Sequence, residues 1–134
     1  MYASLDEETA GREVTARKAR LGGRAQISAY PRFTYLIAVE IDRCTDFRSV
    51  KPSSPLSPAL AAALDEFDLQ VSQQLGQHLM TKGVQGAIVP SLVGPNANVV
   101  AFLDAEPPPR VQITNRDAIL KAIEGWGRRS RKFN

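Results

Sequence analysis

The sequence contains one cysteine, Cys44, and one histidine, His78. This excludes an internal disulfide, and it excludes zinc sites built from cysteines alone or from several imidazoles. Cys44 lies in a strand-like segment, and we expect it to be a buried small hydrophobic residue rather than a reactive thiol. His78 has helical spacing from Leu75 and Leu79, so we expect it at the core or its rim. No metal site is predicted.

Long hydrophobic runs and a signal-peptide pattern are also lacking. No apolar run approaches the ~20 residues of a membrane span. The first residues, MYASLDEETAGREV, carry acids where a signal peptide needs a basic and then an apolar region. We therefore expect a cytoplasmic protein with no membrane partner. Its 134 residues, 43% of them hydrophobic, suffice for one domain with one core.

The net charge is only +3, but the basic residues are clustered. Residues 11–32 hold six basic side chains against one acid, and the tail GRRSRKFN adds four more. A nucleic-acid surface is one interpretation, but aromatic residues are not interleaved with the basic ones and no reader motif occurs. A solvated basic face, or one that meets a phosphate ligand or an acidic partner, explains the pattern at least as well.

The pattern of elements predicts a single α+β domain, residues 1–134, with a mixed central sheet flanked by helices. The first helix should begin at the cap Asp6 and end at Gly22-Gly23, with Ala10 and Val14 on its apolar stripe. Segment 32–42 is apolar on both faces, which is typical of a strand in the middle of a sheet. The other expected elements are the end of a strand at Tyr2 and Ala3, two helices between Ser57 and Lys82, strands 87–90, 98–103 and 111–114, and a short last helix that stops at Gly125.

Four polar residues could carry chemistry, although each also has an ordinary structural interpretation. Glu13 lies in the first helix and could simply pair with Arg17, four residues on. Ser91 follows a predicted strand and could be a turn serine bonded to its own backbone. Asn98 could serve a turn, and Tyr2 could pack in the core. No G-x-S-x-G elbow, P-loop or G-x-G-x-x-G motif occurs, so a serine hydrolase and the common phosphate cradles are not supported.

The order of the segments is more informative than any one of them. MYASLDEETAGREV resembles the segment LY-x-A-L-D-x-x-T-A-x-x-E-V of the RES-domain family, the toxins of Xre–RES toxin–antitoxin systems. YLIAVEIDRCTDF is similar to the family's central strand and the Asp-Leu-type segment after it. QQLGQHLMTKGVQGAIVPS is similar to its helix and G-[IL]-x-x-P-S motif, and NANVVAF to its closing N-[LV]-V-x-F strand. The resemblance spans roughly residues 2–103.

The resemblance implies a fold related to ADP-ribosyltransferase toxins and an activity that degrades NAD+ at the nicotinamide–ribose bond, by hydrolysis or phosphorolysis. NAD+ would be the substrate, with no cofactor. An Xre-family antitoxin would be the protein partner, and nucleic acid would be met only through it; self-association into a homo-oligomer is left open. The family's active-site tyrosine, glutamate and serine match Tyr2, Glu13 and Ser91, and Asn98 matches its asparagine near the pocket.

These residue types fit the implied chemistry. A carboxylate such as Glu13 can stabilise the positive charge of an oxocarbenium-like centre. The ring of Tyr2 could stack on the nicotinamide, while Ser91 and Asn98 could donate hydrogen bonds to amide or phosphate oxygens. The assignment requires Ser91 and Glu13 to lie on the same side of the fold.

One residue of the family pattern, an arginine upstream of the tyrosine, has no counterpart because this sequence begins after its position. That arginine would be the natural clamp for the pyrophosphate, and Arg12, Arg17 or Arg32 could take its place. We therefore expect either a shortened product with weak or no activity, which could still bind a nucleotide or the antitoxin, or a start that lies further upstream. A basic nucleic-acid-binding protein is the third alternative.

Overall fold

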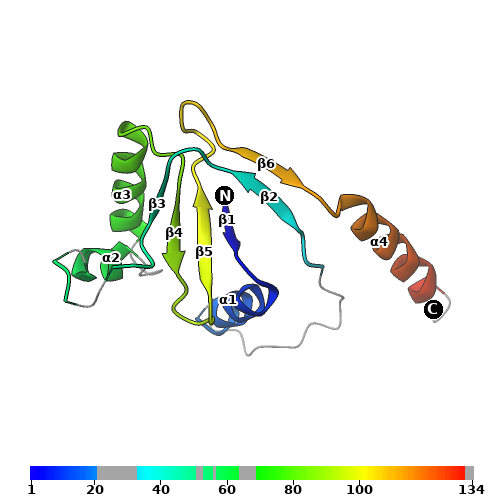
Figure 1. Cartoon of the computed structure of the whole chain (residues 1–134). Helices are drawn as coiled ribbons and strands as arrows, with labels where there is room; N and C mark the ends of the chain where they lie inside the picture. Colours follow the sequence, from blue (N-terminus) through cyan, green and yellow to red (C-terminus); the bar gives the residue numbers. More distant parts are fainter. Residues whose placement is uncertain (21–32, 51–52, 56, 64–68, 132–134) are drawn as a thin grey trace. The chain divides into compact units, whose positions relative to one another are not determined.

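The computed structural model describes residues 1–20, 33–50, 53–55, 57–63 and 69–131. Contacts between Cα atoms group the chain into two units, Met1–Gln26 with Ile41–Pro109 and Ile27–Glu40 with Arg110–Asn134. The mixture of helices and strands confirms the predicted α+β class, whereas the relation to ADP-ribosyltransferase toxins stays a prediction. In chain order the elements are β1 (Tyr2–Ser4), α1 (Glu7–Arg20), β2 (Ile37–Glu40), β3 (Cys44–Asp46), α2 (Ser57–Ala63), α3 (Leu69–Thr81), β4 (Gly86–Pro90), β5 (Ala97–Ala101), β6 (Arg110–Ile113) and α4 (Arg116–Arg131) (Figure 1).

The first unit contains a mixed sheet with the strand order β1-β5-β4-β3. The strands β1, β5 and β4 are antiparallel neighbours, and β3 runs parallel to β4 at one edge. The mixed sheet and the strand at Tyr2 were both predicted, and both are confirmed. Figure 1 shows α1 at the end of the sheet where β4 turns into β5.

Helix α1 begins as predicted at the cap Asp6. The Asp6 carboxylate accepts a hydrogen bond from the Thr9 amide at 2.7 Å, which satisfies one of the free amides of the first turn. The predicted apolar stripe is wrong, because Val14 is 45% exposed whereas Thr9 is fully buried. The inward face of α1 is polar, since Thr9 and Glu13 make hydrogen bonds to the β4–β5 region.

Small residues form the buried part of the sheet. The buried apolar side chains on β4 and β5 are Ala87, Val89, Ala97 and Ala101, while the largest fully buried side chains in the described residues are polar, Asn98 and Thr9. A close approach of two backbones explains the glycine at the start of β4. A Cβ added at Gly86 would lie 2.7 Å from the Val100 carbonyl oxygen.

Helix α3 ends in a Schellman motif. Gly83 has a φ of 74°, which favours glycine, and the Val84 amide donates to the Leu79 carbonyl at 3.1 Å. The buried side chain of Gln85 follows; it accepts from the Asp42 amide at 2.8 Å and donates to the Pro107 carbonyl at 2.9 Å. Gln85 therefore joins the start of β4 to two distant segments of the same unit.

The second unit pairs β2 with β6 in an antiparallel ladder. The prediction that segment 32–42 is a middle strand is wrong for the described residues, in which β2 has β6 as its single partner. An apolar pattern on both faces does not fix the number of partner strands. The Leu36 carbonyl accepts from the Thr114 amide at 2.8 Å and the Leu36 amide donates to the side chain of Asn115 at 2.8 Å, so both groups bond to the segment that follows β6. Leu36 itself is 57% exposed.

The last helix is longer than predicted. Helix α4 runs from Arg116 to Arg131 and passes through Gly125 and Gly127. A glycine costs a helix only about 1 kcal/mol relative to alanine, so a single glycine does not by itself stop one.

Two predictions about single residues are also corrected. Cys44 is exposed and not buried, because the short edge strand β3 has β4 as its one partner in the described residues. His78 is exposed on α3 and not in the core.

Some predicted features lie outside the described residues, among them the Gly22-Gly23 stop and the side chains of residues 17–32, which include most of the N-terminal basic cluster. Within the described residues, no helix combines the length and the apolar character needed to cross a bilayer.

Candidate functional site

A cluster of polar side chains surrounds the carboxylate of Glu13. Its Oε1 accepts a hydrogen bond from the Ser91 hydroxyl at 2.7 Å and another from the Asn98 amide nitrogen at 2.8 Å. The Tyr2 hydroxyl lies 3.5 Å from the same oxygen. Tyr2 from β1, Ser91 from the β4–β5 turn and Asn98 from β5 therefore meet at Oε1 of Glu13, a residue of α1.

The hydroxyl of Ser91 is held in one orientation. It donates to Glu13, and its oxygen accepts from the amides of Gly94 at 2.9 Å and Val93 at 3.2 Å. The turn is closed by the Ser91 amide, which donates to the Asn96 carbonyl at 3.2 Å. Because both backbone donors come from the same turn, the shape of residues 91–96 determines where the hydroxyl proton points.

The side chain of Asn98 is fully buried and bonded at both ends. Its Oδ1 accepts from the Ser4 hydroxyl at 2.6 Å, and its Nδ2 donates to Glu13. Ser4 and Asn98 are opposite residues of the β1–β5 ladder, so strand register brings them together. The two bonds also decide which end of the amide is oxygen, since Glu13 can only accept when ionised.

Tyr2 is the exposed member of the cluster. Its side chain is on β1, two residues before Ser4 and therefore on the same face of the strand. The residue is 56% exposed while its hydroxyl reaches Glu13. An exposed ring beside a fixed carboxylate can contact a ligand that also contacts Glu13.

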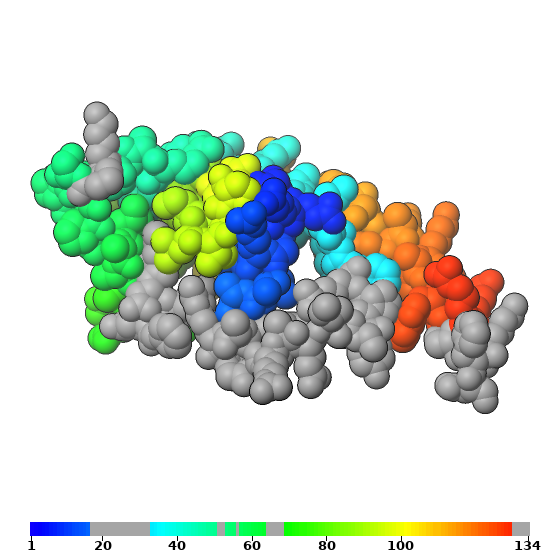
Figure 2. Space-filling view, turned by 90° about the horizontal axis from the view of Figure 1, so that it is seen from below, coloured from blue at the N-terminus to red at the C-terminus, as the bar shows by residue number. Residues whose placement is uncertain are grey.

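The structure thus brings together four of the residues selected from the sequence: Tyr2, Glu13, Ser91 and Asn98. Figure 2 shows the N-terminal segment, in blue, directly against the β4–β5 region, in yellow. The expectation that Ser91 and Glu13 lie on the same side of the fold is confirmed by their hydrogen bond. The alternative interpretation of Ser91, a turn serine bonded to nearby backbone, is also correct in part, because the Gly94 amide donates to its hydroxyl oxygen.

The candidate arginines are not brought into this cluster by the described contacts. Arg12 makes an ion pair with Glu8 at 2.6 Å on the exposed face of α1. Arg17 lies on the same helix, but its side chain is outside the described residues, and so is all of Arg32. Their role as substrate-binding residues stays a prediction.

Sequence reasoning missed the supporting residues Ser4 and Thr9. Ser4 orients Asn98, and Thr9 accepts a hydrogen bond from the Asn96 amide at 3.2 Å. A signal for Thr9 existed, because it lies four residues before Glu13 and hence on the same helix face. Ser4 could be found only from the pairing of β1 with β5.

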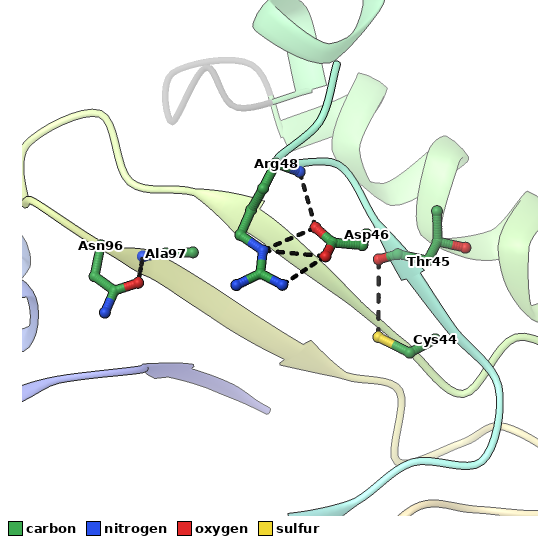
Figure 3. Close-up of polar contacts among 6 residues, drawn as sticks. All are labelled: Cys44, Thr45, Asp46, Arg48, Asn96 and Ala97. Atoms are coloured by element: carbon green, nitrogen blue, oxygen red, sulfur yellow. Dashed lines mark hydrogen bonds and ion pairs between the residues drawn. The ribbon is translucent and has the colours of Figure 1, made fainter.

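A second group of polar residues lies at β3, on the opposite edge of the sheet (Figure 3). Arg48 makes a forked pair with Asp46, with a shortest distance of 2.6 Å. This guanidinium holds the pKa of Asp46 below its usual value, and partial burial raises the pKa of the neighbouring Cys44 thiol. A raised pKa means less thiolate at neutral pH, so Cys44 is a poor nucleophile.

The Glu13 cluster, formed by Tyr2, Glu13, Ser91 and Asn98, is the arrangement that could support a reaction. One carboxylate oxygen is occupied by donors, and within the described side chains Oε2 has no hydrogen-bond partner. Such a carboxylate can stabilise a positive charge or bind hydroxyl groups without reorganising. Among the described residues no three His, Cys, Asp or Glu side chains come together as a metal site.

Comparison with known proteins gives one finding. Neither the curated proteins nor the solved structures yielded a significant match. The model of the RES domain matches residues 1–121, a range that contains every member of the Glu13 cluster. Since the match covers most of the 134 residues, the chain belongs to the RES domain family.

Proposed function

We propose that this protein is a RES-type toxin that degrades NAD+ by cleaving the nicotinamide–ribose bond. RES domains are generally associated with toxin–antitoxin systems. The observation that carries the proposal is the Glu13 carboxylate, which Ser91 and Asn98 hold by one oxygen beside the exposed ring of Tyr2. NAD+ is the substrate and no cofactor is required.

The reaction needs few groups from the protein. Nicotinamide leaves as a neutral molecule, and the ribose carbon gains positive charge as the bond breaks. Glu13 stabilises that charge, because its carboxylate is already oriented by two donors before the reaction begins. Water or phosphate then adds to the ribose carbon, and ADP-ribose or its phosphorylated form is released.

Ser91 acts in this proposal as a positioning residue and not as a nucleophile. Its proton goes to Glu13 and its oxygen already accepts two amide hydrogen bonds. The sequence suggested that Ser91 and Asn98 donate hydrogen bonds to the substrate, but both side chains donate to Glu13 instead. Tyr2 is the residue suited to stack on the nicotinamide ring.

The protein partner in this proposal is a cognate Xre-family antitoxin, and the place of action is the cytoplasm. A partner that covers Tyr2 and the Glu13 carboxylate would block access of NAD+. DNA would be contacted by the antitoxin and not by this chain.

The test is nicotinamide release from NAD+ by the purified chain, measured with and without phosphate. We compare Glu13→Gln, which keeps the shape but removes the charge, with Glu8→Gln on the exposed face of the same helix. The first change should lower the rate roughly 100-fold or more, because it removes the charge that stabilises the transition state. The second should change it by less than about 2-fold, because its ion pair is exposed.

Dependence of the rate on phosphate would identify phosphorolysis, and independence would identify hydrolysis. Release that Glu13→Gln leaves intact would refute the proposal. A folded chain that binds NAD+ but releases no nicotinamide would instead be a nucleotide-binding domain without catalysis.

A further inference from the structure

We propose that Thr9 is a positioning residue that anchors the β4–β5 turn, residues 91–96, to helix α1 and thereby holds Ser91 against Glu13. As a statement about catalysis this rests on the proposed function. As a statement about the turn it stands on the contacts alone.

Thr9 connects the helix cap to the turn through one hydroxyl group. The Thr9 hydroxyl donates to the Asp6 carboxylate at 3.1 Å, and its oxygen accepts from the Asn96 amide at 3.2 Å. Because an ionised carboxylate can only accept, the hydroxyl proton must point to Asp6, which leaves the oxygen lone pairs for Asn96. Thr9 is fully buried, so water does not compete for either bond.

The turn also packs directly on Thr9. A Cβ added at Gly94 would lie 2.5 Å from the Thr9 Cγ2 atom and 2.8 Å from its Cα atom, so only glycine allows this approach. The amide of the same Gly94 donates to the Ser91 hydroxyl oxygen at 2.9 Å. The contact with Thr9 therefore places a donor that orients Ser91.

Thr9 and Glu13 are four residues apart and lie on one face of α1. The helix thus touches the same turn region twice, once at Thr9 and once, a helical turn later, at Glu13 through Ser91. Two contacts prevent the turn from rotating about either one. Without the Thr9 contact, the turn would be held to the helix by the Ser91–Glu13 hydrogen bond and by the side-chain hydrogen bond of Asn96 with the cap Asp6.

The test uses Thr9→Val, which keeps the size of the side chain but removes the hydroxyl. Hydrogen–deuterium exchange of peptides covering residues 91–98 reports the turn, and steady-state kinetics of nicotinamide release reports the site. We expect exchange in this segment to become roughly 10-fold faster, and kcat to fall roughly 10-fold with KM changed by less than about 3-fold.

Two controls separate positioning from general damage. Thr9→Ser keeps the hydroxyl and should restore both readouts to within about 3-fold of the unmodified chain. Thr15→Val is the matched control on the same helix, where the exposed hydroxyl donates only to the Gly11 carbonyl at 3.0 Å, and it should change neither readout.

Gly94→Ala tests the same contact from the side of the turn and leaves the buried Thr9 and its cap intact. Gly94 does not have a positive φ, so an alanine is opposed by the contact with Thr9 and not by its own backbone. It should loosen the turn and lower kcat as Thr9→Val does. This second variant decides the question if Thr9→Val does not fold.

The outcomes are distinct. Faster exchange and lower kcat in both variants support the proposal. Unchanged exchange in a folded Thr9→Val chain, or faster exchange with unchanged kcat, overturns it. If the unmodified chain releases no nicotinamide, the proposed function fails, and the exchange data still decide whether Thr9 anchors the turn.

Discussion

The two edges of the four-stranded sheet carry polar groups of different kinds. At the edge formed by β1, hydrogen bonds join residues 94 positions apart in Ser4–Asn98, 85 apart in Asn98–Glu13 and 78 apart in Ser91–Glu13. At the opposite edge, formed by β3, the hydrogen bonds between Asp46 and Arg48 in Figure 3 join residues only two positions apart. The first set fixes elements relative to one another, and the second orders only its own segment.

Burial follows the same division. Asn98 is fully buried, whereas the Asp46 and Arg48 side chains are 43% and 48% exposed. A buried polar group that loses its partner cannot turn to water, so each bond at the β1 edge is costly to break. An exposed pair exchanges its partner for water at little cost. The density of polar contacts therefore does not identify the site, but their burial and sequence separation do.

Two asparagines in the same segment give the sharpest form of this comparison. Asn98→Ala should lower the free energy of unfolding by about 2–4 kcal/mol, because it removes the buried partner of the Ser4 hydroxyl and leaves Ser91 as the one close donor to Glu13 among the described side chains. It should also abolish most nicotinamide release. Asn96→Ala should cost less, about 1 kcal/mol, because Asn96 is exposed: its Oδ1 accepts from the next amide, that of Ala97, and its side chain also hydrogen-bonds the Asp6 carboxylate.

Urea denaturation of both variants, with linear extrapolation, measures the two losses. Equal losses of stability in Asn98→Ala and Asn96→Ala would contradict the distinction between buried contacts that join distant segments and exposed contacts. A loss confined to activity, with stability unchanged in Asn98→Ala, would show that the buried amide orients Glu13 without supporting the sheet.

Much of this site was predictable because its members follow recognisable local patterns. The cap at Asp6 and the strand before Ser91 are local features, and the resemblance to the RES family selected four residues from their segments: Tyr2, Glu13, Ser91 and Asn98. Their meeting at one Glu13 oxygen was not predictable from periodicity, because it depends on the antiparallel pairing of β1 with β5.

The errors have a common physical origin. Cys44 and segment 32–42 are apolar enough for a core, but strand pairing decides burial. β3 lies at an edge of its sheet, and β2 has β6 as its single partner in the described residues. Val14 was assigned to the inward face of α1, yet hydrogen bonds turn the polar face of Thr9 and Glu13 inward. Apolar character alone did not predict these orientations.

Asp6, which caps α1 and accepts a hydrogen bond from Thr9, should make the stability of the protein depend on pH. The Thr9 amide, which donates to Asp6, holds the pKa of Asp6 below its ordinary value of 3.8 and outweighs the partial burial that raises it. A carboxyl with a lowered folded pKa stabilises the fold above its unfolded pKa, and this stabilisation is lost as pH falls through the folded pKa. We therefore expect unmodified protein to be more stable than Asp6→Asn at pH 6.0 or so, with the difference shrinking below about pH 4.

Thermal unfolding of both proteins over a pH series measures this difference. Asparagine is a good control because it still caps a helix but carries no charge. A stability gap that stays constant down to about pH 2 would contradict the assignment of the effect to ionised Asp6.

The smallest effect is expected at the β3 edge. Arg48→Ala should raise the pKa of Asp46 toward its ordinary value of 3.8, because the side-chain hydrogen bonds from Arg48 are the first cause of its depression. By the same linkage, the pair stabilises the fold above the unfolded pKa of Asp46 and ceases to do so as pH falls through its folded pKa. Because both side chains are largely exposed, the change should shift the thermal midpoint by no more than about 2 °C and leave nicotinamide release unchanged.

An NMR titration of the carboxyl groups measures both acids in one experiment, and the pKa of Asp6 serves as the internal control because it lies in the other polar group. A shift at Asp46 alone is the expected result. A fall in nicotinamide release, or a parallel shift at Asp6, would mean that the β3 edge is coupled to the Glu13 cluster through β4 and β5. The two edges would then act together, and sequence separation would no longer distinguish a site from a solvated ion pair.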